Sequence, residues 1–152
     1  MEHLRQDDRP SWDEYFLSLA NEVSTRATCL RAQHGCVIVR DRIVISSGYN
    51  GSPRGFPHCT EKGCIMLEGH CVACEHAERN AIYQAAKHGS SSLKGSTAYV
   101  TGSPCIHCLR GLICTGVERI VYKDKGHYPY PEEEEKIRQH FIKTSGIKIE
   151  KG

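Results

Sequence analysis

The stretch Thr97-Ala-Tyr-Val-Thr-Gly-Ser-Pro-Cys-Ile-His-Cys-Leu-Arg-Gly-Leu-Ile-Cys114 predicts a strand that runs through a sharp turn into a helix. Its first five residues are mostly β-branched or aromatic, a composition typical of strands. Pro104 has no N–H to leave unpaired in the first turn of the helix, and Gly116 provides a stop just after its end. Residues 119–122 are strand-like again, so the region predicts a β-α-β unit.

Further segments extend this unit in both directions. Ser11 and Glu14 form a capping box ahead of an amphipathic pattern, and two β-branched runs flank a short charged turn at 41–42. The acidic run 132–135 suits a helix N-terminus and is interpreted as solvated. The order of elements predicts an α/β fold, a three-layer α/β/α arrangement around a central mixed five-stranded sheet. The added elements are helices over 12–26, 76–88 and 132–141 and strands over 36–39, 43–46 and 147–149.

Length and charge limit the class of protein. The 152 residues fit one domain, predicted here to span 1–152. Twenty Lys and Arg against eighteen Asp and Glu leave a formal net charge of +2, too balanced to indicate a nucleic-acid or membrane partner. The polar start MEHLRQDDRP lacks the apolar run of a signal peptide, so we expect a cytoplasmic protein.

Two short motifs, H-A-E at 76–78 and P-C-I-H-C at 104–108, carry the chemistry. His76, Cys105 and Cys108 are zinc ligands by type, and three protein ligands leave one position for a water whose pKa falls to about 7. Glu78 is predicted to be catalytic by moving the proton of that water; the alternative is a capping carboxylate in a first helical turn. H-x-E followed by P-C-x-x-C is the signature of zinc deaminases.

The other cysteines offer a rival interpretation. Nine cysteines in a cytoplasmic chain indicate metal binding rather than disulfides. Cys71 and Cys74 could join the pair at 105 and 108 in a zinc ribbon, but ribbon pairs are usually about 15–20 residues apart, and here 30 residues separate them. A ribbon would also leave the H-A-E motif unexplained. Cys36 and Cys114 lie in apolar contexts and are predicted to be small buried hydrophobes.

Taken together, these residues resemble the deoxycytidylate (dCMP) deaminases of the cytidine-deaminase superfamily, especially phage and bacterial competence-operon members. The likeness includes S-W-D-E-Y at 11–15, G-Y-N-G-S-P at 48–53, H-A-E-R-N-A-I at 76–82 and the P-C-I-H-C motif. It implies a cytidine-deaminase-like fold and zinc-dependent hydrolytic deamination of dCMP to dUMP, with dCTP to dUTP as a further reaction of some members. The 1–152 segment would then be one zinc-dependent deaminase domain.

The resemblance also implies substrate contacts and regulation. Asn50 would hydrogen-bond the sugar, Arg26 would approach the phosphate or remain a surface side chain, and Tyr128 would lie near the base or serve as a loop anchor. Many relatives are homohexamers activated by dCTP and inhibited by dTTP, and Mg²⁺ can accompany such nucleotide effectors.

A second, structural zinc is the last implication of the resemblance. Positions matching Cys29 and Cys59 hold it in some phage-type members, with partners just before the H-x-E helix. Those partners would come from His70, Cys71 and Cys74. Cys64 and His58 are further candidates for this site. The long 50–75 segment is interpreted as a loop, and a zinc site closed by four protein ligands would order it.

Two other functions share parts of this pattern. A deaminase of nucleic-acid bases, acting on tRNA adenosine or DNA cytidine, needs a surface for flanking nucleotides, which the near-neutral charge and low aromatic content do not favour. A non-enzymatic zinc-stabilised interaction module would not need Glu78, which is present.

Overall fold

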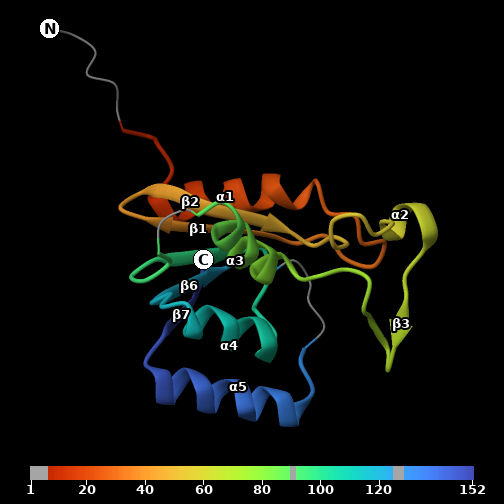
Figure 1. Cartoon of the computed structure of the whole chain (residues 1–152). Helices are drawn as coiled ribbons and strands as arrows, with labels where there is room; N and C mark the ends of the chain where they lie inside the picture. Colours follow the sequence, from red (N-terminus) through yellow and green to blue (C-terminus); the bar gives the residue numbers. More distant parts are fainter. Residues whose placement is uncertain (1–6, 90–91, 125–128) are drawn as a thin grey trace, which may run out of the picture.

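The computed structural model describes residues 7–89, 92–124 and 129–152, which form a sheet between two helical layers (Figure 1). One face of the sheet is covered by α1, and the other carries α3, α4 and α5. The predicted three-layer α/β/α fold with a mixed five-stranded sheet is therefore confirmed. The helices are α1 (Trp12–Ser24), α2 (Cys59–Lys62), α3 (Ala77–Lys87), α4 (Ile106–Cys114) and α5 (Glu132–Ser145).

The strands follow the order β2-β1-β5-β6-β7 across the sheet. β1 is antiparallel to both β2 and β5, whereas the β5–β6 and β6–β7 pairs are parallel. Parallel neighbours need a crossover, which α4 provides for the first pair and α5 for the second. Both helices therefore lie on the same face. The strands are β1 (Gly35–Arg40), β2 (Ile43–Tyr49), β5 (Thr97–Val100), β6 (Arg119–Tyr122) and β7 (Lys148–Lys151).

Alternating side chains in the central strands build a core on each face. On β1, Val37 and Val39 pack toward α1, while Cys36 and Ile38 pack toward α3 and α4. This is the two-residue period of a strand that is buried on both sides.

Helix α1 begins as the sequence predicts. The Ser11 hydroxyl accepts a hydrogen bond from the Glu14 N–H at 3.2 Å, and the Glu14 carboxylate accepts one from the Ser11 N–H at 3.0 Å. Such a cap contributes about 1 kcal/mol. The helix ends at Ser24, two residues before the predicted end, where the Thr25 N–H turns back to the Glu22 and Val23 carbonyls.

The segment between β2 and α3 is more structured than predicted. It contains α2 and a two-stranded ribbon of β3 (Met66–Leu67) and β4 (His70–Cys71) that projects from the body of the molecule (Figure 1). The ribbon turns at Glu68 and Gly69, whose φ angles of 49° and 80° suit a tight hairpin. Two-residue strands are too short to produce a detectable hydrophobic period, so these strands could not be predicted.

Close backbone packing places α3 directly against β2. A Cβ atom added to Gly48 would lie 2.4 Å from the backbone nitrogen of Ala81, so a larger residue there would push the helix away. The Ser46 hydroxyl in the same strand donates to the Ala81 carbonyl. The N-terminus of α3 is therefore held at a fixed distance from the sheet.

Two predictions at the other helices need correction. Cys36 is buried as predicted, but Cys114 is exposed because it lies on the side of α4 opposite the buried Cys108 and Leu112. Helix α5 runs four residues past its predicted end and stops at Gly146, whose φ of 75° is left-handed.

None of the helices formed by the described residues is long and apolar enough to cross a membrane.

Candidate functional site

The beginnings of two helices bring the three predicted zinc ligands together. His76 is the N-cap of α3, and Cys105 is the N-cap of α4, with Cys108 about one turn further on. His76 Nδ1 lies 3.5 Å from Cys105 Sγ and 3.4 Å from Cys108 Sγ. The three donor atoms are all within 4.8 Å of one another.

Backbone contacts to the end of β2 fix where α3 begins. Gly51 and Glu75 form an isolated bridge in which each N–H donates to the other carbonyl, at 3.2 and 2.9 Å. The Asn80 amide donates to the Tyr49 carbonyl at 2.8 Å, across the same junction. His76 thus follows directly after a residue that the sheet end holds in place.

The donor separations fit zinc. With bonds of about 2.0–2.1 Å to nitrogen and 2.3 Å to sulfur, tetrahedral zinc separates a nitrogen from a sulfur by about 3.5 Å. The two N–S distances at His76 match this value. Three such donors leave one coordination position, the arrangement found in hydrolytic zinc sites.

Glu78 lies buried in the first turn of α3, beside these donors, with 6% of its surface exposed. Burial raises the pKa of its carboxyl above the usual 4.5, an effect that the neighbouring His76 partly offsets. The Cys108 thiol is also within hydrogen-bonding reach of this carboxyl. A carboxyl with a raised pKa holds and releases a proton nearer neutral pH, which suits acid–base work better than simple helix capping.

The pKa values of the two thiols in this group are shifted in opposite directions. Hydrogen bonds from Cys108 and from His76 lower the pKa of the Cys105 thiol to about 3, against the opposing effect of burial. The pKa of Cys108 is raised, first by its hydrogen bond to Cys105 and then by burial, with the nearby charge of Glu78 adding to the effect. A cation bound between the two sulfur atoms would favour the thiolate form of both.

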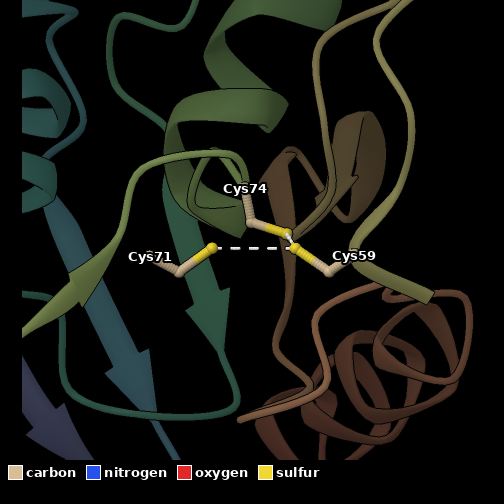
Figure 2. Close-up of side chains that lie close together, drawn as sticks. All are labelled: Cys59, Cys71 and Cys74. Carbon is tan, nitrogen blue, oxygen red and sulfur yellow. Dashed lines mark hydrogen bonds between the residues drawn. The ribbon is translucent and has the colours of Figure 1, made fainter. Parts of the chain in front are cut away.

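A second group of sulfur atoms lies in the segment between β2 and α3. The side chains of Cys59, Cys71 and Cys74 point toward one another (Figure 2), with Cys59 Sγ 3.6 Å from Cys71 Sγ and 3.2 Å from Cys74 Sγ. Sulfur ligands of tetrahedral zinc lie about 3.8 Å apart. Cys29 and Cys64 pack against the same cluster.

The thiols of this cluster have divergent pKa values. Burial and hydrogen bonds to its sulfur neighbours raise the pKa of Cys59 to about 12. Burial would also raise that of Cys71, but the backbone N–H groups of Cys74 and Ala73 lower it to about 7. A thiol whose pKa is near 7 loses its proton readily, and a metal ion can deprotonate and bind it together with its close neighbours.

Two histidines predicted as further partners lie elsewhere. His70 is exposed on β4, outside the group of three gathered cysteines. His58 is the N-cap of α2, and its Nδ1 lies 2.9 Å from the Thr28 hydroxyl. Of the predicted candidates, the structure therefore groups cysteines rather than histidines.

The predicted substrate contacts are spread more widely. Asn50 is buried, its Oδ1 accepts the His34 N–H, and its Nδ2 donates to the Ala32 carbonyl, both at 2.7 Å. Arg26 is exposed just after α1. Tyr128 lies outside the described residues.

Sequence reasoning missed the support that α5 gives to the site. The acidic run 132–135 was interpreted as solvated, yet Glu134 accepts a hydrogen bond from the Ile106 N–H at the start of α4, at 3.2 Å. Arg138, only 4% exposed, donates from Nε to the Pro104 carbonyl at 2.9 Å. The sequence shows only an arginine one helical turn beyond an acidic run, and the burial of Arg138 became visible in the structure.

A cavity of about 580 Å³ lies apart from these donors, between β2 and α3. Its wall includes the residues of the G-Y-N-G-S-P segment other than Asn50, together with the basic side chains of Arg54, His58, Lys87 and His88. Its charge suits an anionic ligand.

Known proteins share this fold and these motifs. Residues 10–124 match the model of the cytidine and deoxycytidylate deaminase zinc-binding region. ComE operon protein 2 of Bacillus subtilis is 41% identical over 127 residues, which cover 83% of this chain and 67% of that protein. The deoxycytidylate deaminase of Mycobacterium phage D29 is 39% identical over 126 residues, covering 75% of this chain and 95% of that protein.

A solved structure is similar to this chain over almost its whole length. The crystal structure of dCMP deaminase from the cyanophage S-TIM5 in complex with dCMP and dUMP superimposes with a TM-score of 0.77 and 27% identity, covering 95% of this chain and 98% of that chain. His76, Cys105 and Cys108, which could hold a metal ion, lie within the matched zinc-binding region, and the chain therefore belongs to the cytidine and deoxycytidylate deaminase family.

Proposed function

We propose that this chain converts dCMP to dUMP by hydrolytic deamination, with zinc held by His76, Cys105 and Cys108 and with Glu78 as the catalytic acid–base. The observation that carries the proposal is the gathering of one imidazole nitrogen and two thiols at the separations of a zinc site, beside a buried carboxyl. Family membership and the relatives named deoxycytidylate deaminase support the same reaction.

Zinc bound there supplies a water activated for attack at neutral pH. The overall reaction is dCMP plus water giving dUMP plus ammonia. Glu78 accepts a proton from the attacking water and delivers it to the ring nitrogen next to the amine-bearing carbon. It then takes the second proton of the same water oxygen and delivers it to the amine, which leaves as ammonia when the C–N bond breaks. The raised pKa of Glu78 supports this role because the carboxyl must both take and return a proton.

We also propose a structural zinc at the second sulfur cluster. Cys59, Cys71 and Cys74 supply three thiolates, and Cys29 and Cys64 are the neighbours from which the fourth would come. Four protein ligands would leave no position for water, so this metal would stabilise the fold and take no part in the reaction. The segment it would hold includes α2, the β3–β4 ribbon and the approach to α3.

Substrate binding remains a proposal for two described residues. Asn50 has a second amide hydrogen and a second lone pair beyond the bonds it makes, so it keeps capacity for a sugar hydroxyl. Arg26 is exposed and has the planar fork that suits a phosphate. The role of Tyr128 near the base rests on the resemblance alone.

We further propose that the chain acts as a cytoplasmic homohexamer regulated by dCTP and dTTP, with Mg²⁺ accompanying these effectors and residues 1–152 forming one deaminase domain. The basic cavity between β2 and α3 supports effector binding, because Arg54, Lys87 and His88 supply positive charge to meet a triphosphate. Sedimentation with and without each nucleotide would test the assembly.

The test of the proposed function is deamination followed by ultraviolet absorbance, with cytidine, dCMP and dCTP as substrates, each alone and with dCTP or dTTP as effector. We expect turnover of dCMP that requires zinc. Activity on cytidine but not on either nucleotide would overturn the assignment.

A further inference from the structure

The turn 103–106, which carries Cys105 into the start of α4, is held by residues that lie 27 to 35 positions further along the chain. The Tyr130 hydroxyl donates to the Ser103 carbonyl at 2.5 Å. Arg138 donates from Nη2 to the Ser103 hydroxyl at 2.6 Å and from Nε to the Pro104 carbonyl at 2.9 Å. These supporting residues lie beyond position 124, where the match to the family's zinc-binding region ends.

Arg138 is placed by contacts on several sides. Its side chain is 5% exposed, its guanidinium carbon lies 4.6 Å from the centre of the Tyr130 ring, and Nη1 is 2.5 Å from the Glu135 carboxylate. A buried guanidinium is costly unless it is paired and hydrogen-bonded. Removing it would leave polar groups of the turn without their partner.

The bond to Pro104 acts on a ligand of the proposed metal centre. The Pro104 carbonyl and the Cys105 nitrogen belong to one planar peptide unit. Arg138 fixes the direction of that carbonyl and with it the orientation of the peptide plane. The position of the Cys105 side chain depends on this orientation, because its backbone nitrogen is part of the plane. Pro104 is itself fully buried, so the turn is packed as well as hydrogen-bonded.

Glu134 holds the first N–H of α4. An N-cap side chain serves the second or third N–H of its helix, so the N–H of Ile106, the first helical residue, needs another partner. The Glu134 carboxylate accepts that N–H at 3.2 Å. The start of α4 is therefore tied to α5 beside Cys105, whose sulfur faces His76.

We propose that Arg138 is a positioning residue of the zinc centre, which holds the Ser103–Pro104 turn so that Cys105 meets His76 and Cys108, while Glu134 holds the first N–H of α4. The inference rests on the proposed function and adds to it a support that lies outside the recognised zinc-binding region. It assigns α5 a part in metal retention as well as in packing.

The test compares Arg138→Met with Lys136→Met, a matched loss of a cation from an exposed position of the same helix. Zinc release to a chromophoric chelator is followed for each variant, and the phase missing in Cys105→Ala is assigned to the catalytic site. For Arg138→Met we expect that phase to be about 10–100-fold faster and kcat to fall by a similar factor, with little change in KM. Lys136→Met should match the unmodified protein in both measurements.

Conservative variants keep the test decisive. Arg138→Lys retains the positive charge and one donor nitrogen but lacks the planar guanidinium that reaches two acceptors at once. Its rate of zinc release should therefore lie between that of the unmodified protein and that of Arg138→Met. Ser103→Ala removes a single bond to Arg138 and should show a smaller change in the same direction, which serves if Arg138→Met does not fold. A lower melting temperature with unchanged zinc release and kcat would show a packing role alone and overturn the inference. Failure of the unmodified protein to deaminate dCMP would instead refute the proposed function.

Discussion

The two sulfur sites of this chain use similar donors on very different supports. His76, Cys105 and Cys108 are placed by the N-termini of two regular helices that abut the sheet. The second site draws Cys59 and Cys71 from a four-residue helix and a two-residue strand. Within the described parts of the chain, these are the two groups of side chains that could hold a metal ion.

The difference in support corresponds to a difference in chemistry. The helical site has three donors and a buried carboxyl beside them, so it can retain water and move a proton. The site in the irregular segment has three gathered thiols with Cys29 and Cys64 packed against them, which suits closure by sulfur. Rigid elements place the reacting groups, whereas the second cluster would order a segment whose own packing is slight.

Loss of a ligand at the first site should have the largest effect. Cys105→Ala removes one of three ligands, and we expect activity on dCMP to fall below detection while one zinc per chain is retained. The readout is zinc content by metal analysis together with the deamination rate. Retention of both zinc ions with normal turnover would break the distinction between the sites.

Glu78→Gln should separate metal binding from chemistry. The amide keeps the size of the carboxyl but cannot shuttle a proton, so we expect kcat to fall by about 100- to 10,000-fold. Zinc content should equal that of the unmodified chain, because Glu78 is not one of the three donors. Turnover within a few-fold of the unmodified rate would remove Glu78 from the mechanism.

Cys74→Ser should give the opposite pattern at the second site. We expect the loss of one zinc per chain and a decrease in the free energy of unfolding on the order of 4 kcal/mol, because a metal-held segment would lose its metal. Turnover at low temperature should persist, since the helical donors are untouched. Urea unfolding and metal analysis measure these effects, and a metal content equal to that of the unmodified chain would exclude the structural zinc.

A salt bridge remote from both sites should give the smallest effect on stability, and it serves as a reference for the variants at the two sites. Arg119 donates to both carboxylate oxygens of Asp13, at 2.9 and 2.6 Å, and this hydrogen bonding lowers the pKa of Asp13 below 3.8. A lowered pKa in the fold means that the stabilisation is present above pH 3.8 and is lost as the pH falls through the lowered value. The pair is partly exposed, so its contribution is about 1 kcal/mol.

Asp13→Asn should therefore reduce the free energy of unfolding at pH 7 by about 1 kcal/mol, and the difference should vanish in acid. Zinc content and kcat should not change. Denaturant unfolding at a series of pH values checks this, and a difference that persists undiminished in acid would contradict the ionic origin of the effect.

Much of the fold was predictable because its signals are local. Each signal is contained within a few residues: the capping box of α1, the β-branched runs of β1 and β2, and the strand–turn–helix around Pro104. The β3–β4 ribbon was not predictable, because strands of two residues have no period. The exposure of Cys114 was missed because an apolar neighbourhood in sequence does not specify the buried side of a helix.

By itself, the sequence determined the order of the helices and strands outside the 50–75 segment and the set of residues able to bind zinc, since spacing along the chain and side-chain chemistry are local properties. Only the tertiary structure decided which cysteines gather at the second site and that Arg138 and Glu134 reach the turn before α4. The contacts of Glu134 and Arg138 join residues that are 28 and 34 positions apart, and they depend on how α5 packs against α4. No short-range pattern encodes that packing, because it arises from burying both helices on one sheet face.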